Sequence, residues 1–191
     1  AERVLAAAAE QKLPPWHTAV SLPISGHNVH LAAGFSDLRS CGLVRYRCDE
    51  LRGYDHLRAW LDHLVLCASP PQGVALRTRH LAFDGDLVFE ALTPDIAGRY
   101  LADLLLLYAE GLQCPVPFFR KAAWEYVQGG MKKARTKWFG APNAKGRPES
   151  GDIWHALAWR GVEDPLDDQF MQTAETVFRP MISHLAGEKP G

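Results

Sequence analysis

Strand-like segments and turn signals, interrupted by one helical pattern, lie in the first half of the chain, and only helical patterns follow them. The strand-like segments cover residues 17–24, 28–34 and 43–48. The turn sequence Ser40-Cys41-Gly42 predicts a hairpin between the last two, and residues 74–92 predict a second hairpin that turns at Asp84-Gly85. Strands this short and few can build only a small sheet. The order predicts an α+β fold with one small mixed or antiparallel sheet flanked by helices, and a helical C-terminal half.

Helices are predicted where strong helix formers cluster or where apolar residues recur at helical spacing. Between Asp55 and Ala68 the apolar residues fall on one face, and Asp55 is placed to cap the helix. Thr93 and Pro94 predict the start of a long helix that runs to about Gly111. The other predicted helices cover residues 2–12, 119–127, 131–139, 152–160 and 164–185.

The composition is that of an ordinary globular chain. Of its 191 residues, 47% are apolar and 23% are charged, which predicts one domain over residues 1–191. The net charge of −1 indicates no general affinity for nucleic acid. The chain begins at Ala1 and not at Met, and its helical start suggests a domain taken from a longer protein.

Neither a membrane segment nor a redox framework is predicted. Apolar runs such as Leu104 to Leu107 are far too short to cross a bilayer, and no signal-peptide pattern opens the chain. The four cysteines lack a C-x-x-C pair, which argues against both a disulfide framework and a zinc site. We therefore expect reduced thiols, no metal or other cofactor, no membrane contact and a cytoplasmic location.

The stretch GFSDLRSCGLVRYRCDE, residues 34–50, has the outline of a metal-dependent nuclease site. Such a site needs an acid on one strand and an acid-x-Lys on the next, because the carboxylates hold Mg²⁺ and the lysine stabilises developing charge. Side chains two apart share one face of a strand, so Arg45 and Arg47 occupy those two places. Arginine is always protonated and offers only donors, so it cannot ligate a hard cation. Asp37, Arg45 and Arg47 therefore predict a degenerate site with no catalytic residues, in which Asp37 and Arg45 form a cross-strand ion pair.

Two alternatives stay open at this place. In the first, the arginine pair contacts DNA phosphate. In the second, a displaced carboxylate replaces the missing ligand in an active nuclease. Asp49 is the candidate, because it falls on the face of Arg45 and Arg47 if the strand continues.

Basic residues concentrate between residues 118 and 150, where eight Lys and Arg stand against two acidic residues. The cluster MKKARTKW within this segment could hold nucleic-acid backbone without reading its sequence. The alternative is a solvated helix face beside an acidic C-terminal segment. The candidate DNA-binding residues are Arg120, Lys121, Lys132, Lys133, Arg135 and Lys137.

Several segments occur in the order that a known family shows. The first half carries GLVRYRCDELRGYDHLRAWLDHLVLCAS, and the second carries KKARTKWFG, GDIWHALAWRG and DPLDDQFMQTAETVFRPM. Together they resemble the C-terminal end of the RecC family, the gamma subunits of exodeoxyribonuclease V (RecBCD). The resemblance covers about Leu13 to Leu185.

This resemblance implies a fold similar to the RecB nuclease domain, of the PD-(D/E)XK type, without its catalytic residues. It also implies a complex with RecB and RecD, in which the domain supports assembly of RecD near the point where duplex DNA is separated. Two hypotheses follow: a non-catalytic docking module, or a surface that guides DNA by its backbone. Aromatic residues dominate the energy of protein interfaces. The candidate partner-binding residues are Trp124, Tyr126, Trp138, Phe139, Trp154 and Trp159.

Overall fold

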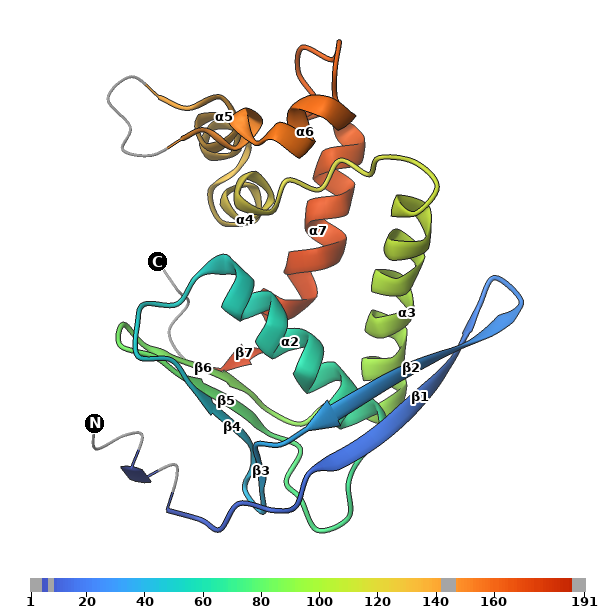
Figure 1. Cartoon of the computed structure of the whole chain (residues 1–191), viewed down its shortest axis with the longest axis vertical. Helices are drawn as coiled ribbons and strands as arrows, with labels where there is room; N and C mark the ends of the chain where they lie inside the picture. Colours follow the sequence, from blue (N-terminus) through green and yellow to red (C-terminus); the bar gives the residue numbers. More distant parts are fainter. Residues whose placement is uncertain (1–4, 7–8, 142–146, 187–191) are drawn as a thin grey trace. The chain divides into compact units, whose positions relative to one another are not determined.

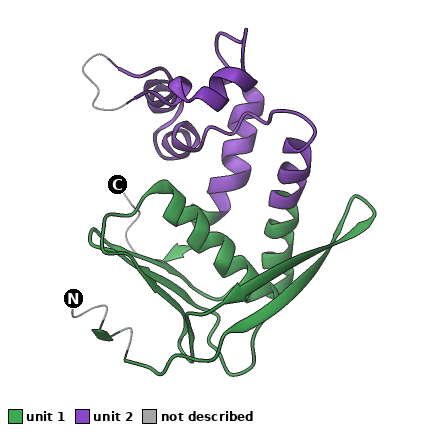
Figure 2. Ribbon diagram, in the orientation of Figure 1, with its two compact units in different colours: residues 1–103, 181–191 green, residues 104–180 purple. Residues whose placement is uncertain are grey.

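The chain divides into two compact units, each of which is described by itself. The structure is a computed structural model that describes residues 5–6, 9–141 and 147–186 (Figure 1). Unit 1 comprises residues 1–103 and 181–191, and unit 2 comprises residues 104–180 (Figure 2). Helices α3 (Pro94–Gly111) and α7 (Asp168–Ser183) each contribute residues to both units. Whether residues 1–191 fold as the single domain predicted from the sequence stays a prediction.

Unit 1 contains two sheets where the sequence predicted one. Strands β1 (Trp16–Ile24) and β2 (His27–Phe35) form an antiparallel ribbon, joined by Ser25 and Gly26, which both have positive φ. Such a two-residue turn matches the twist of a hairpin and returns β2 along β1. The hairpin predicted between residues 28–34 and 43–48 is therefore wrong, because residues 28–34 are already paired with β1.

The second sheet has five strands and is mixed. Its strand order is β3-β4-β5-β6-β7. Strands β4 and β5 are parallel and are connected through helix α2 (Gly53–Ala68), whereas the other neighbouring pairs are antiparallel. The α+β class and the mixed sheet agree with the prediction. The strand bounds are β3 (Leu38–Arg39), β4 (Gly42–Tyr46), β5 (Thr78–Leu81), β6 (Asp86–Phe89) and β7 (Leu185–Ala186).

Two turns that connect strands of the five-stranded sheet lie where the sequence predicted them. Ser40 and Cys41 join β3 to β4, and Asp84-Gly85 lies between β5 and β6. Gly42 has φ +116°, and a Cβ added there would lie 2.1 Å from the backbone oxygen of Arg77. Glycine is thus required where β4 begins, because the backbone of Arg77 approaches too closely for any side chain.

Helix α2 covers the sheet with its apolar face and forms the core of unit 1. Trp60 is buried against Phe89 and stacks on His184, with ring centroids 5.2 and 5.8 Å apart. The helix begins at Gly53, so Asp55 is not its N-cap as predicted. Asp55 instead lies within the first turn, where its carboxylate accepts a hydrogen bond from the backbone N–H of Arg52 at 2.9 Å.

The helices of the second half agree closely with the predicted ones. Thr93 caps α3 through its hydroxyl, which accepts from the backbone N–H of Ile96 at 3.4 Å. The core of unit 2 forms around Phe119, Phe170 and Phe178, which are fully buried. The remaining elements are α4 (Arg120–Gly129), α5 (Met131–Phe139), the 3-10 turn η1 (Glu149–Gly151) and α6 (Ile153–Ala158).

Two predictions concern the ends of the chain and its apolar segments. The helix predicted over residues 2–12 falls partly outside the described residues, and residues 9–12 are not helical. Within the described chain, helices are either too short or too polar to cross a bilayer. All four cysteines lie among the described residues and are free.

Candidate functional site

Arg45 of β4 and Arg47, which directly follows this strand, point to the face of the sheet that α2 covers. Leu43 is fully buried, Arg45 and Arg47 are half-buried, and Tyr46 is exposed on the opposite face. The alternation agrees with the face assignment made from the sequence. Asp55 and Asp62 of α2 meet the arginines.

Arg45 lies between two carboxylates. Its Nη1 donates to Oδ2 of Asp62, and its Nε lies 3.7 Å from Oδ2 of Asp37. The ion pair predicted between Asp37 and Arg45 is thus present, although Asp37 precedes β3 and is not part of a strand. Lys12 lies 3.7 Å from the other oxygen of Asp37. Asp37, the acid that a nuclease site would use to hold metal, therefore lies between two positively charged side chains.

Arg47 forms a second set of ion pairs beside the first. Its Nη1 donates to Asp55 and its Nη2 to Asp49, both at 3.2 Å. Asp49 also accepts from Arg52 at 2.8 Å. The backbone N–H of Glu50, followed by Arg47 and Arg52, lowers the pKa of Asp49. Asp49, the candidate for a displaced metal ligand, is thus engaged by two guanidinium groups.

Burial shapes the electrostatics of this face. Loss of solvent raises the pKa of Asp62, and the charge of Arg45 opposes that shift. His80 of β5 stands opposite Arg45 in the strand register, and burial lowers its pKa. A buried carboxylate with no counter-charge would take up a proton, so Arg45 is what favours the ionised form of Asp62.

The arginine network, defined as Arg45 and Arg47 with Asp37, Asp49, Asp55 and Asp62, sets two guanidinium groups against four carboxylates. Lys12 and Arg52, which pair with Asp37 and Asp49, supply the two further positive charges that neutralise it. A cation entering it would have to displace a guanidinium from the carboxylates that it binds. Among the described residues, no three His, Cys, Asp or Glu side chains are grouped to hold a metal ion. The arrangement can hold β4 against α2, and it presents no free carboxylate pair.

Sequence reasoning did not identify Asp55 and Asp62 as partners of the arginines. The signal was present: the two acids are seven residues apart on a predicted helix, hence about 10 Å apart on one face. The two arginines lie about 7 Å apart on one strand face. Matching the two spacings requires knowing that α2 packs on β4, which the sequence alone did not show.

The candidate DNA-binding residues divide into paired and unpaired groups. Arg135 is bound to Asp164 at 2.5 Å, and Lys137 lies 3.6 Å from Glu125. The other four have no acidic partner within 4 Å in the described part of the chain. These four are Arg120, Lys121, Lys132 and Lys133.

The candidate partner-binding aromatics are also distributed between core and surface. Trp138 is only 4% exposed and packs with its ring tilted against Phe119, with centroids 4.0 Å apart. It is therefore a core residue, because a side chain this buried cannot anchor a partner. Half-buried positions are taken by Trp124, Tyr126 and Trp159. Phe139 and Trp154 are exposed, at 45% and 72%.

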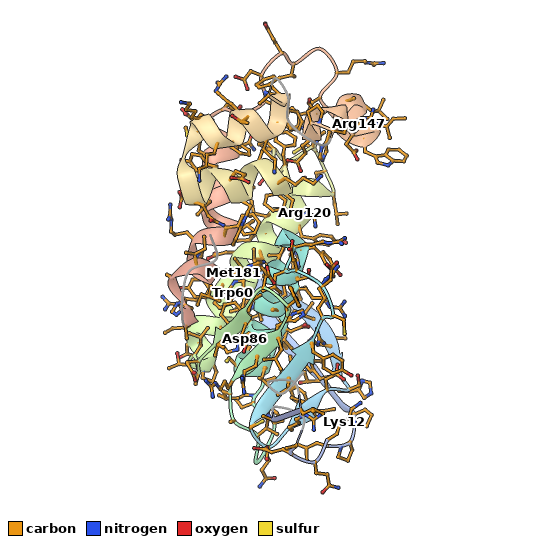
Figure 3. The ribbon with its side chains drawn as sticks, turned by 90° about the vertical axis from the view of Figure 1, so that its left-hand side faces the viewer. Lys12, Trp60, Asp86, Arg120, Arg147 and Met181 are labelled. Carbon is orange, nitrogen blue, oxygen red and sulfur yellow. The ribbon has the colours of Figure 1, made fainter. Side chains whose placement is uncertain are left out.

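A cleft in unit 2 brings several of these elements together. It has a volume of about 460 Å³ and lies between the start of α4, the turn η1 and the start of α6. Arg120 and Arg147, which contribute to its lining, are labelled in Figure 3. Arg147 was not among the residues chosen from the sequence. The other lining residues used below are Lys121, Glu149, Asp152 and Ile153.

The structure is thus of the α+β class. Its small mixed sheet carries a charged face on which the acidic and basic side chains pair with one another. The model of the RecC C-terminal domain matches residues 1–130, and the chain belongs to this family. The RecBCD enzyme subunit RecC of Escherichia coli strain K12 is 25% identical over 179 residues. The alignment covers 85% of this chain and 16% of that protein, so the chain spans a small part of the relative's length.

Proposed function

We propose that this chain is a non-catalytic docking domain of a DNA-repair complex of the RecBCD type. In this role it supports assembly of a RecD subunit beside RecB, near the point of duplex separation. The observation that carries the proposal is the position of Arg45, which takes the place of a metal-binding acid and binds Asp62 and Asp37. Membership of the RecC family supports the proposed complex.

We propose further that the five-stranded sheet is a PD-(D/E)XK-type core that has lost its metal site. Two features support this proposal: Asp37 precedes β3, and Arg45 on β4 and Arg47 directly after it have the two-residue spacing of the acid and lysine in such a core. Both arginines contact α2, the helix that follows β4. Arginine at the acid position removes a ligand and adds a positive charge, and both effects oppose cation binding.

A nuclease assay tests the absence of catalysis. The purified chain is incubated with single-stranded and duplex DNA in Mg²⁺, beside the Asp37→Ala variant purified in the same way. We expect equal background with both proteins. Cleavage that disappears in Asp37→Ala would show an active metal site and overturn the proposal.

Co-elution with separately purified RecD and RecB proteins from the same source tests docking. Trp154→Ser is compared with the control Phe83→Ser, since Phe83 is similarly exposed but lies in unit 1. We expect association with the unmodified chain, weakened about tenfold or more by Trp154→Ser, because exposed aromatic anchors dominate interface energies. Failure of the unmodified chain to associate with either protein contradicts the docking role.

A second candidate function, guidance of DNA by its backbone, is favoured by one observation. Four of the six predicted DNA-binding cations lack an acidic partner among the described residues, so they are available to phosphate. Backbone binding predicts weak affinity, no sequence preference and a steep loss with salt. The double variant Lys132→Glu and Lys133→Glu is expected to flatten the salt dependence. Affinity that does not change with salt argues against this function.

A further inference from the structure

The acidic residues of the unit 2 cleft are already engaged by the backbone. Glu149 is buried, and its two carboxylate oxygens accept the backbone N–H groups of Lys121 at 3.0 Å and Ala122 at 2.8 Å. These donors belong to the first turn of α4. Asp152 accepts the backbone N–H of Trp154 at 2.9 Å, at the start of α6. Both acids therefore serve as helix caps.

The basic residues of the same cleft have no such partners. Within the described chain, the charged groups of Arg120, Lys121 and Arg147 form no ion pair within 4 Å, and the charge of Arg147 acts on Asp152 only from farther away, where it helps to lower the pKa of that carboxyl. The side chain of Arg147 lies across the η1 turn, where a Cβ added to Gly151 would be 2.8 Å from its Nε. Three cations thus line a cleft whose two carboxylates already accept backbone hydrogen bonds, which leaves the cleft complementary to added negative charge.

An apolar surface adjoins this positive charge on α6. The inner side of the helix carries His155 and Trp159, whose rings lie 5.3 and 5.5 Å from Phe119. The outer side carries Ile153 and Trp154, both 72% exposed, and Leu157, 61% exposed. Ile153 also lines the cleft. Large apolar side chains exposed together on so short a helix are typical of a surface that binds protein.

We propose that the cleft and the outer face of α6 bind an acidic segment of a partner protein that also carries large apolar side chains. Its carboxylates pair with Arg120, Lys121 and Arg147, and its apolar side chains cover Ile153 and Trp154. A volume of about 460 Å³ accommodates a few side chains of such a segment. Clusters of arginine and lysine recognise acidic motifs by charge-assisted hydrogen bonds.

The apolar surface beside the cations favours a peptide over nucleic acid. Phosphate would satisfy the cations equally well, and Trp154 could stack on a base. Ile153 and Leu157 have no aromatic face, so a nucleic acid would leave them uncovered. This proposal rests on the proposed function in one respect: the acidic segment is taken to belong to a subunit of the RecBCD-type complex.

Peptide binding to the complete 191-residue chain provides the test. The probe is a dye-labelled synthetic peptide in which glutamate alternates with leucine and phenylalanine, followed by fluorescence anisotropy. One control peptide has lysine in place of glutamate, and the other has serine in place of leucine and phenylalanine. An unlabelled oligothymidylate serves as competitor.

Two double variants separate the charged and apolar parts of the site. Lys121→Glu with Arg147→Glu reverses the charge of the cleft and leaves the backbone caps of α4 intact. Ile153→Ser with Trp154→Ser removes the apolar surface. The matched controls are Arg99→Glu and Phe83→Ser, both at exposed positions of unit 1. Circular dichroism establishes that each variant folds.

We expect each double variant to weaken binding of the glutamate peptide by about tenfold or more, with both controls unchanged. Either control peptide should bind at least about tenfold more weakly than the probe. Equal binding of the lysine peptide, or no effect of the variants, overturns the proposal. Displacement of the peptide by oligothymidylate at matched concentration also overturns it, in favour of a nucleic-acid surface.

Comparison with the co-elution assay separates this proposal from the proposed function. If the chain associates with RecD or RecB and the charge-reversed variant associates equally well, the cleft is not the docking site, although the docking role stands. If the peptide binds as expected and neither subunit associates, the cleft proposal stands and the proposed function fails.

Discussion

At the scale of single residues, Arg45 and Arg47 form a structural ion-pair network with the aspartates around them. Arg45 and Arg47 each contact an acid of α2, and Arg45 also contacts Asp37. Burying two charges is costly unless they are paired, so removing one partner leaves a worse state than removing both. The network therefore predicts a specific pattern of mutant stabilities.

Arg45→Met is expected to lower the free energy of unfolding by about 2 kcal/mol, because it leaves the largely buried Asp62 without its counter-charge. Adding Asp62→Leu should recover most of that loss. Urea denaturation of both single variants and the double variant measures the coupling. Arg77→Met is the control: Arg77 pairs with Glu90 at the surface, so its loss should cost less than about 1 kcal/mol. Additive losses in the double variant contradict the prediction.

His63 predicts how stability depends on pH. Its Nε2 lies 3.0 Å from the backbone oxygen of Glu90, which can only accept, so Nε2 carries the proton and Nδ1 accepts from Thr78 at 3.1 Å. Burial lowers the pKa of His63 from 6.5 to about 4. The folded state thus binds this proton less tightly than the unfolded state. Stability from neutral His63 is complete above pH 6.5 and is lost as pH falls toward about 4.

The loss of unfolding free energy from His63 over this range is about 3 kcal/mol. Urea denaturation at pH 7 and at acid pH, repeated with His63→Gln, measures it. The variant should show a smaller decrease with acid, and a remaining decrease is expected because burial also lowers the pKa of His56 and His80. An unchanged pH dependence in His63→Gln would show that His63 does not titrate in this way.

At the scale of elements, distant side chains decide where the helices of unit 2 begin. The N-cap position of α4 is Phe119, whose side chain cannot cap the helix. The carboxylate of Glu149 in η1 accepts the backbone N–H groups of the first turn instead. A carboxylate at this end also interacts favourably with the helix dipole. Glu149 therefore both lines the cleft and caps α4. Because its carboxylate accepts these backbone hydrogen bonds, it is unavailable to a ligand.

Glu149→Ala is expected to lower the free energy of unfolding by about 1–2 kcal/mol, because two backbone N–H groups lose their acceptor. Amide hydrogen exchange should accelerate at Lys121 and Ala122 before the rest of α4. Glu163→Ala, at an exposed position of unit 2, is the control and should have little effect. Equal effects of the two variants would show that Glu149 does not act as a cap.

At the scale of the whole molecule, α3 and α7 supply residues to both compact units. A helix unfolds cooperatively along its length, so a continuous helix resists the unfolding of one unit alone. The sequence-based expectation of one folding domain leads to a test of cooperativity.

Thermal unfolding is expected to show a single transition. Far-ultraviolet circular dichroism should coincide with tryptophan fluorescence recorded from Trp60→Phe and Trp138→Phe variants, whose replaced residues lie in units 1 and 2. Comparing each probe at the same protein concentration controls for aggregation. Two separated transitions, each with a smaller fluorescence amplitude in one of the variants, would show that the units fold independently.

Sequence alone determined the features that depend on neighbouring residues. The order of the longer elements, the turns at Ser40-Cys41 and Asp84-Gly85, and the helix start at Thr93 follow from local backbone preferences, whereas the two-residue strands β3 and β7 were not predicted. The chemistry of Arg45 and Arg47 follows from the guanidinium itself, which cannot ligate a cation in any fold.

Only the tertiary structure decided which distant residues meet. It paired β2 with β1 instead of β4, and it brought Asp62 to Arg45 across the packing of α2 on the sheet. It also buried Trp138 and exposed Trp154, two residues that look alike in sequence. Local propensity carries no information on such contacts, because they depend on how complete elements pack and on which side chains that packing removes from water.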